Sequence, residues 1–391
     1  MQNGRRGRLH PAVGRARTLL EQNINHFLGQ TLIHASGKAR PQENPPLFLV
    51  GCSGGPDSLA LASLAAHFVR RGEIRIGAII VDHQLQTGSD EVAAQAAQTC
   101  RDMGLSPVLV RSVTVDADHE GPEMAARIAR YAAFEDAVKE TGAQGIMLAH
   151  TLDDQAETVL LGLARGSGTK SLGGMSPVRV HHGVNYLRPL LNLRRYEVEQ
   201  ICVAECLDPW YDPTNLDQSL MRAKVRHSIL PFLEEHLGGS VALSLARTAA
   251  ISGPDAQYLE EEAERVFARV QLELSAVGGV ESLNLPTETN MQGVVVINRY
   301  ALSQEHPALQ HRVLSLAVRS LGGENPSFER LQALGELLCG HTIAGPIQLA
   351  GKVSAYRRRP PAKVTVELRS SAEKKEILLK ETGVIVLLTT V

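Results

Sequence analysis

The 391-residue chain lacks several features that mark whole classes of protein. It has no apolar run near the roughly 20 residues that span a bilayer, and its arginine-rich start has no apolar signal-peptide segment. The formal net charge is only −2, so no overall positive field attracts nucleic acid. These absences favour a cytoplasmic protein without a membrane segment, in which any RNA contact comes from local clusters.

Cysteines are also few, and their spacing forms no framework. The chain has five, an odd number, and no C-x-x-C pair, which fits a reducing compartment. Cys202 and Cys206 stand four apart on an expected helix and share a face, but no neighbouring histidine completes a metal site. We therefore expect no metal at this pair.

The most informative stretch is residues 47–63, LFLVGCSGGPDSLALAS. An apolar run ends at two glycines, and an alanine- and leucine-rich helix follows, so the loop lies between a buried strand and a helix N-terminus. Glycines admit a phosphate close to the backbone, and the first amides of a helix lack internal partners. This loop predicts a phosphate-binding site formed by Ser53, Gly54, Gly55, Pro56, Asp57 and Ser58.

The loop lacks the lysine of a Walker A motif and carries the carboxylate of Asp57 in its place. A carboxylate beside phosphates is best explained as a ligand for Mg²⁺, which neutralises both. The alternative is that the two glycines only form a turn and Asp57 caps the helix.

Apolar runs alternate with helical stretches through the first half of the chain. The runs LFLV, GAIIV, PVLVRSV and GIMLAH are separated by helices expected near residues 58–71, 89–103 and 122–140. Strands that are apolar on both faces and alternate with helices indicate a parallel, doubly wound sheet of the α/β class. Such sheets bind ligands at the carboxyl ends of their strands.

Polar residues follow two of these runs. The second run ends in Val81-Asp82-His83-Gln84-Leu85, where the polar pair after Val81 either lines an adenosine pocket or caps a turn. His150 ends the fourth run, and Asp154 and Glu157 lie three apart on one face of the next helix. Acidic residues in a first helical turn complement the helix dipole, but this group also suits a metal or a cationic substrate such as an amine.

Two arginine pairs have equally open interpretations. Arg127 and Arg130 are helical neighbours that either clamp phosphate or form surface ion pairs, and Arg222 and Arg226 face one way on a basic stripe that is either solvated or bound to RNA.

The character of the chain changes after about residue 235. Amphipathic stretches at 241–274 and 306–341 indicate a helical module, and residues 347–368 are expected to form a hairpin with basic residues around its turn. We divide the chain at these changes into a basic tail and helix (1–45), an α/β domain that carries the phosphate-binding loop (46–234), a helical domain (235–343) and a short β-rich segment (344–391).

Several motifs together resemble one family. They are SGGPDSLAL, VDHQL, ARIARYAAF, AHTLDDQAETVLL, ARGSGTKSLGGM, RPLL and the DPTNLD to KVRHSILPFLE stretch, in the family's order over most of residues 47–235. On these residues the chain resembles the tRNA(Ile)-lysidine synthetases of the PP-loop ATP pyrophosphatase superfamily. Two positions depart from the pattern: Thr151 replaces a frequent second histidine, and Gln86 a frequent arginine.

The resemblance implies a PP-loop, adenine nucleotide alpha hydrolase-like fold and a ligase that uses ATP, Mg²⁺ and L-lysine. In the implied reaction, the wobble cytidine of the CAU anticodon of tRNA(Ile) is adenylated, and the lysine ε-amine then displaces AMP to give lysidine. The resemblance implies these roles: catalysis by Asp57, Asp154, Glu157, His150, Arg127 and Arg130; ATP binding by residues 53–58, Val81 and Asp82; a magnesium ligand at Asp57; and RNA contacts by Arg222 and Arg226.

Three other functions are weighed against this one. A tRNA thiolase needs a catalytic cysteine pair or a cluster-binding C-x-x-C, which the sequence lacks. A synthetase of the NAD or GMP type does not need the RNA-suited second module. A non-catalytic RNA-binding relic has no use for intact Asp57, Asp154 and Glu157. The sequence leaves the oligomeric state open, with a homodimer among the candidates.

Overall fold

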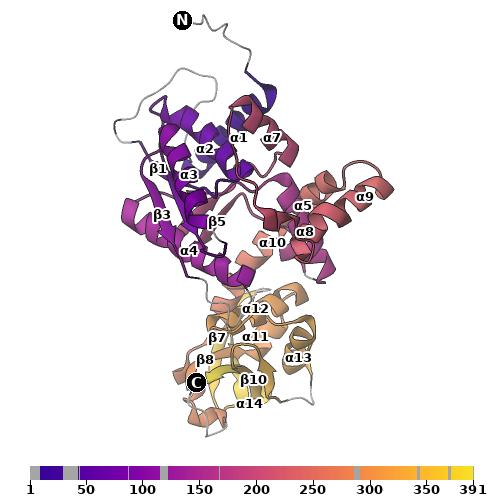
Figure 1. Ribbon diagram of the computed structural model, residues 1–391. Helices are drawn as coiled ribbons and strands as arrows, with labels where there is room; N and C mark the ends of the chain where they lie inside the picture. The colour runs from indigo at the N-terminus through magenta and orange to yellow at the C-terminus, as the bar shows by residue number, and fades with distance from the viewer. Residues whose placement is uncertain are drawn as a thin grey trace, which may run out of the picture. The chain divides into compact units, whose positions relative to one another are not determined.

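The computed structural model describes residues 9–29, 43, 45–86, 88–114, 122–166, 168–285, 291–340, 344–368 and 371–390 (Figure 1). Its contacts divide the chain into two compact units, Met1–Gly253 and Pro254–Val391. This division is coarser than the four segments expected from the sequence. Residues 1–8 of the expected basic tail lie outside the described ranges. Among the described helices, none combines the length and hydrophobicity needed to cross a bilayer.

A six-stranded sheet forms the centre of the first unit, in the order β3-β2-β1-β4-β6-β5. Neighbouring strands are parallel except for the edge strand β5, which runs antiparallel to β6. The predicted parallel sheet is therefore confirmed, while β5 was not expected because its mostly half-exposed VRVH residues form no apolar run. The strands are β1 (Leu47–Gly51), β2 (Arg75–Asp82), β3 (Val108–Ser112), β4 (Ile146–Met147), β5 (Val178–His181) and β6 (Val184–Leu187).

Helices cover both faces of this sheet, because alternate side chains of its strands point in opposite directions. In β1, Phe48 and Val50 pack into one core, and Leu47 and Leu49 pack into another with α4 (Pro122–Thr141). The first core also takes residues from four helices, which are α1 (Pro11–Leu28), α2 (Pro56–Val69), α3 (Ser89–Asp102) and α7 (Arg195–Ala204). This two-sided burial is the doubly wound arrangement.

The strand order reverses between β1 and β4, the two central strands. They pair in parallel, with Leu49 opposite Ile146 and Val50 opposite Met147. The glycine loop follows β1 and leads into α2, whereas the acidic motif follows β4 and leads into α5 (Leu152–Ala164). Both motifs therefore lie at the carboxyl edge of the sheet, at the switch point where open α/β sheets bind ligands.

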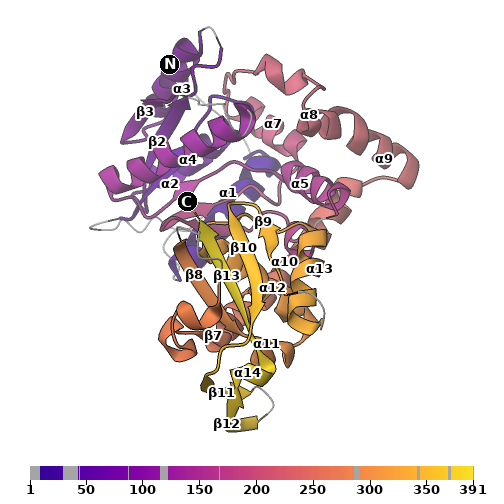
Figure 2. The same cartoon turned by 90° about the horizontal axis from the view of Figure 1, so that it is seen from below.

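The second unit is built on a five-stranded antiparallel sheet of order β7-β8-β13-β10-β9, which Figure 2 shows beside α12 and α13. One hydrophobic core joins these strands to the helices. The elements are β7 (Gln271–Leu272), β8 (Met291–Asn298), α11 (Arg299–Ser303), α12 (Pro307–Ser320), α13 (Phe328–Cys339), β9 (Ile347–Leu349), β10 (Val353–Arg358) and β13 (Val384–Thr390). The long helix α10 (Val241–Val270) spans the division between the units.

The expected single hairpin over residues 347–368 is wrong. β10 pairs with β9 and β13, whereas Lys363 begins β11 (Lys363–Leu368), which pairs with β12 (Ser371–Leu378) in a separate two-stranded sheet. Arg357 donates to the Gly340 carbonyl, and the Arg358 guanidinium lies 4.6 Å from the centroid of the Tyr356 ring. These two arginines thus bind within the unit and do not frame a shared hairpin turn.

Candidate active site

The glycine loop is wound around the hydroxyl of Ser58. Ser58 Oγ donates to the Gly55 carbonyl at 3.0 Å and accepts the Ser53 N–H at 3.1 Å. Gly55 is the N-cap of α2, and Pro56 begins the helix, where a missing N–H costs nothing. The loop therefore presents helix N-terminal amides at the carboxyl edge of the sheet, as a phosphate site requires.

Gly54 is the residue in this loop that must be glycine. Its φ is +80°, a left-handed conformation that side chains disfavour. A Cβ at this position would lie 3.3 Å from the Ala96 Cβ, a contact tighter than usual. Its carbonyl accepts the Trp210 N–H at 3.0 Å, so the segment after α7 fixes the loop from the other side.

Asp57 occupies the first turn of α2, and its surroundings suit a carboxylate that binds a cation. Its Oδ1 is buried and has no hydrogen-bond partner among the described residues. Burial, reinforced by the charge of Asp154, raises the pKa of Asp57 to about 6. A cation beside this carboxylate would supply the missing partner and lower its pKa, and carboxylate oxygen is a ligand that Mg²⁺ prefers.

The acidic motif begins with a capping box. Thr151 is the N-cap of α5, and its Oγ1 accepts the Asp154 N–H at 3.3 Å. In return Asp154 Oδ2 accepts the Thr151 N–H at 2.8 Å and its hydroxyl at 2.9 Å. The threonine that departs from the family pattern therefore holds the Asp154 carboxylate in place.

Glu157 is fully buried and bound by arginines that follow it by more than 60 residues. Arg222 Nε donates to its Oε2 at 2.9 Å, and Arg226 Nε donates to its Oε1 at 2.7 Å. Arg222 lies on α8 (Met221–Lys224), and Arg226 lies on the π-helical turn η2 (Val225–Ile229) that continues it. The structure thus brings the predicted RNA-binding arginines directly onto the predicted acidic pair.

A third arginine, Arg195 at the start of α7, completes this cluster. Its guanidinium lies 3.0 Å from Asp154 Oδ1 and 3.5 Å from Glu157 Oε1. Burial by itself would raise the pKa of Asp154, but Arg195 and Arg222 hold it below its ordinary value. Both acids of the motif are therefore bound by guanidinium groups, and Asp154 stays ionised at neutral pH.

His150 is the neutral member of the site. Burial lowers its pKa to about 4, against a smaller opposing effect of Asp154. Its Nδ1 is buried without a hydrogen-bond partner among the described residues. An uncharged imidazole next to the acidic motif can accept or donate one hydrogen bond to a substrate, but it adds no charge at pH 7.

A small cavity of about 180 Å³ opens beside the acidic motif. Three carboxylates line it, those of Asp153, Glu157 and Glu234, together with the Leu230 side chain. The guanidinium groups of Arg194, Arg195 and Arg226 form the rest of its polar wall. The cavity thus combines an apolar side with acidic groups that can receive a cation.

The end of β2 and the start of α4 carry the remaining predicted residues. Val81 is half-buried and Asp82 buried, and the Asp82 carboxylate accepts the Gln84 N–H at 2.9 Å, which closes a turn. Arg127 lies 3.3 Å from the Tyr131 hydroxyl and 5.0 Å from the centre of its ring. Arg130, three residues later on the same helix, is exposed.

Comparisons with known proteins identify the family of the chain. A model of the PP-loop domain matches residues 19–233, and a model of the TilS substrate binding domain matches residues 298–359. The tRNA(Ile)-lysidine synthase of Leifsonia xyli subsp. xyli is 44% identical over 317 residues, which cover 81% of this chain and 89% of that protein. Those of Streptomyces coelicolor (42%; 80% and 83% covered) and Bifidobacterium animalis subsp. lactis (38%; 89% and 92%) are also similar.

The chain belongs to the tRNA(Ile)-lysidine synthase family. Against this family background, two residues that sequence reasoning missed contribute to the site. Arg195 carried no signal, because a single arginine at a helix start is common. Gln155 belongs to the acidic motif, and its amide bonds both the N–H and the carbonyl of Met175, at 2.7 and 3.0 Å. It thereby anchors the segment that follows Gly173 and Gly174 to α5.

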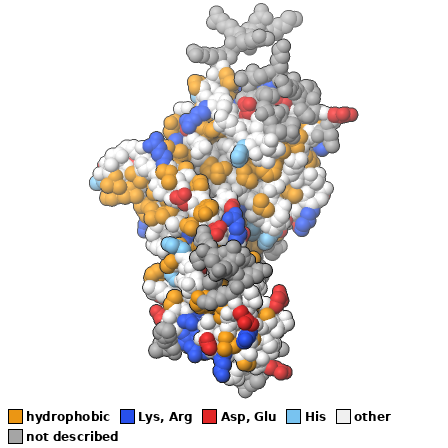
Figure 3. Space-filling model, turned by 180° about the vertical axis from the view of Figure 1, so that it is seen from behind, with side chains coloured by type: hydrophobic (Ala, Val, Ile, Leu, Met, Phe, Trp, Pro, Cys, Tyr) orange, Lys and Arg blue, Asp and Glu red, His pale blue; other side chains and the backbone are white. Residues whose placement is uncertain are grey.

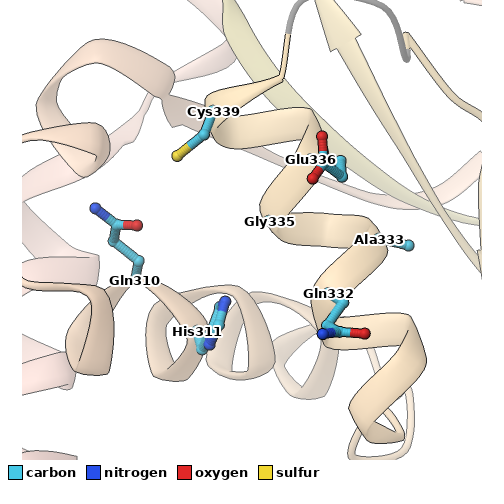
Figure 4. Close-up of a pocket in the computed structure, with 7 residues that line it drawn as sticks. All are labelled: Gln310, His311, Gln332, Ala333, Gly335, Glu336 and Cys339. Carbon is cyan, nitrogen blue, oxygen red and sulfur yellow. The ribbon is translucent and has the colours of Figure 1, made fainter.

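The second unit of this synthase-family chain has its own hollow, of about 510 Å³, between α12 and α13 (Figure 4). Gln310 and His311 come from α12, and the other lining residues are Gln332, Ala333, Gly335, Glu336 and Cys339 of α13. It lies within the segment matched by the substrate binding domain model. None of the residues predicted for catalysis falls here.

Charges on the surface are mixed. Figure 3 shows Lys and Arg side chains interspersed with Asp and Glu on the face that it presents. This mixture agrees with the formal net charge of −2, and it leaves RNA binding to local groups.

Proposed function

We propose that this chain ligates L-lysine to carbon 2 of the wobble cytidine in the CAU anticodon of tRNA(Ile), with cleavage of ATP to AMP and pyrophosphate. Family membership supports the reaction. The observation that carries it is the placement of the phosphate-binding loop and the acidic motif on adjacent central strands, β1 and β4.

In the first step the loop of residues 53–58 holds the ATP phosphates, and the end of β2 at Val81 and Asp82 borders the adenosine. Mg²⁺ held by Asp57 would supply charge neutralisation for the phosphates; the unpartnered Oδ1 of Asp57 supports this assignment. The cytidine O2 attacks the α-phosphorus and pyrophosphate leaves, while Arg127 and Arg130 offset the negative charge that develops there.

In the second step the lysine ε-ammonium first loses a proton to solvent, with Asp154 and Glu157 assisting the transfer, and the free ε-amine attacks carbon 2 of the adenylated cytidine. The C2–O bond breaks, AMP leaves with the oxygen, and the new C–N nitrogen loses a second proton to solvent. Asp154 and Glu157 orient the incoming ammonium, and His150 contributes one uncharged hydrogen bond. Because both acids are bound by guanidinium groups, the ammonium must displace part of those contacts as it enters from the adjoining cavity.

The tRNA must present an unstacked base, which costs a few kcal/mol. We propose that Arg222 and Arg226 contact its phosphates, and that segments of the second unit add further contacts. The tRNA phosphates would then compete with Glu157 for Arg222 and Arg226. RNA binding would thereby release the acidic pair from its arginine partners. We further propose that the enzyme acts in the cytoplasm, where its tRNA substrate would be available, and that it forms a homodimer, which light scattering can test.

The test combines purified protein, ATP, Mg²⁺, labelled lysine and an unmodified transcript of the CAU-anticodon tRNA(Ile). We expect label in the RNA and one AMP per lysine incorporated. A transcript with uridine at the wobble position is the matched control and should take up no label. Incorporation that ignores this base, or ATP–pyrophosphate exchange driven by another small molecule, would reject the proposal.

A further inference from the structure

A second cluster of metal-ligating side chains lies at the opposite edge of the sheet from the phosphate-binding loop. β5 runs antiparallel to β6, and His181 at its end pairs with Val184 at the start of β6. The turn between these two strands therefore lies at the amino ends of the parallel strands. Glu135, late in α4, reaches the same place, and the proposed reaction uses none of these groups.

Three side chains meet there: those of Glu135, His181 and His182. One ligand atom from each lies within 4.8 Å of the others. His182 Nδ1 is 2.9 Å from Glu135 Oε1, and the two imidazole rings stack with centroids 4.0 Å apart. The side chain of Glu135 is 18% exposed and that of His182 is 69% exposed, so the cluster is anchored on one side and reachable from solvent on the other.

The backbone of the turn brings the two histidines together. Consecutive strand residues point to opposite faces of a sheet, which would separate their rings. His182 and Gly183 instead have φ of 46° and 78°, the paired positive values of a type I′ turn, and the ring of His182 returns over that of His181. Asparagine or glycine is the usual choice at the first turn position, so turn geometry alone does not explain a histidine there.

The donor set matches a transition metal better than magnesium. Two imidazole nitrogens and one carboxylate oxygen suit Zn²⁺, whereas Mg²⁺ prefers oxygen ligands alone. Tetrahedral Zn²⁺ with bonds near 2.0–2.2 Å needs ligand atoms about 3.3 Å apart, and the three ligand atoms here lie within 4.8 Å of one another. With three protein ligands, water would fill the fourth position.

Charged neighbours bear on the strength of such a site. Arg127 and Arg179 both act on His181 and disfavour added positive charge, while Glu135 supplies the compensating negative charge.

We propose that Glu135, His181 and His182 bind a divalent transition-metal ion, Zn²⁺, which fastens the β5–β6 hairpin to α4. The same helix carries Arg127 and Arg130 in its first half, so the ion would brace the helix that bears these two arginines.

The test is calorimetric titration of Zn²⁺ into metal-free full-length protein in excess Mg²⁺, with the exposed Cys206 and Cys339 replaced by serine. Three variants remove one ligand each: Glu135→Gln keeps the side-chain shape, His181→Phe keeps a ring against Tyr131, and His182→Asn keeps a residue that the turn favours. Asp136→Asn on the same helix, with a side chain that is 74% exposed, is the matched control.

We expect one Zn²⁺ per chain, a Kd at least about tenfold weaker in each ligand variant, and an unchanged Kd in Asp136→Asn. Co²⁺ should give the visible absorption of an imidazole-ligated ion, lost in the same three variants. Absence of saturable one-to-one binding, or ligand variants that bind Zn²⁺ as tightly as the control, would overturn the proposal. Neither result depends on lysidine formation, so the proposed reaction is tested separately.

Discussion

Replacing Glu157 by glutamine should show what the buried acid contributes to the first unit. Its side chain is 1% exposed and accepts charge-assisted hydrogen bonds of 2.9, 2.7 and 3.1 Å from Arg222 and Arg226. Glutamine keeps the shape but removes the charge, and its amide group turns a donor toward guanidinium donors. The two arginines then lie beside a neutral group and keep Asp154 as their remaining acidic partner.

The size of the loss in unfolding free energy depends on how well water can replace the Glu157 carboxylate as a partner of the two arginines. Removing one member of a buried ion pair costs about 3–5 kcal/mol. The side chains of Arg222 and Arg226 are 36% and 23% exposed, so they recover part of their hydration. We therefore expect a loss of about 2–3 kcal/mol, or a fall of about 5–10 °C in the Tm of this unit.

Urea unfolding and lysine kinetics measure the two consequences. Arg226→Gln alone and combined with Glu157→Gln completes a double-mutant cycle, with an expected coupling of about 1–3 kcal/mol. Glu91→Gln, an exposed acid on α3, should stay within about 0.5 kcal/mol of the parent. Glu157→Gln should also raise the KM for lysine more than that for ATP. A stability loss below about 0.5 kcal/mol with additive single changes would refute the reasoning.

Three further predictions concern the loop and its neighbours. The pKa of Asp57 is raised from 3.8 to about 6, so the folded chain holds the extra proton in that window and Asp57 costs stability as pH rises through it. Asp57→Asn should therefore raise the Tm above that of the parent protein by more at pH 8 than at pH 4, and it should abolish pyrophosphate release from ATP. An equal change in Tm at the two pH values would contradict this. Gly54→Ala should cost about 1–2 kcal/mol and weaken ATP binding, measured by denaturation and calorimetry, since φ is +80° there. In nitrogen-15 NMR the His150 ring should titrate near pH 4, and a midpoint above 6 would show that water reaches it.

Features close together in the chain were predictable. The strand, glycine turn and helix around residues 47–63 depend on neighbours within a few positions, and so does the spacing of Asp154 and Glu157 on one turn of α5. The parallel sheet followed from apolar runs that alternate with helices. Local conformational preference and hydrophobic periodicity carry this information directly, so the α/β class and the place of the candidate motifs along the chain followed from the sequence.

Contacts between residues far apart in the chain could be known only from the tertiary structure. Arg222 and Arg226 looked like a basic surface stripe, yet they bind an acid 65 and 69 residues earlier because α8 and η2 dock against α5. The sequence also led to a wrong hairpin, since β10 takes its partners from β9 and β13 instead of from the next strand. Side-chain spacing determines which residues share a helix face, but which charges meet depends on how separate elements pack.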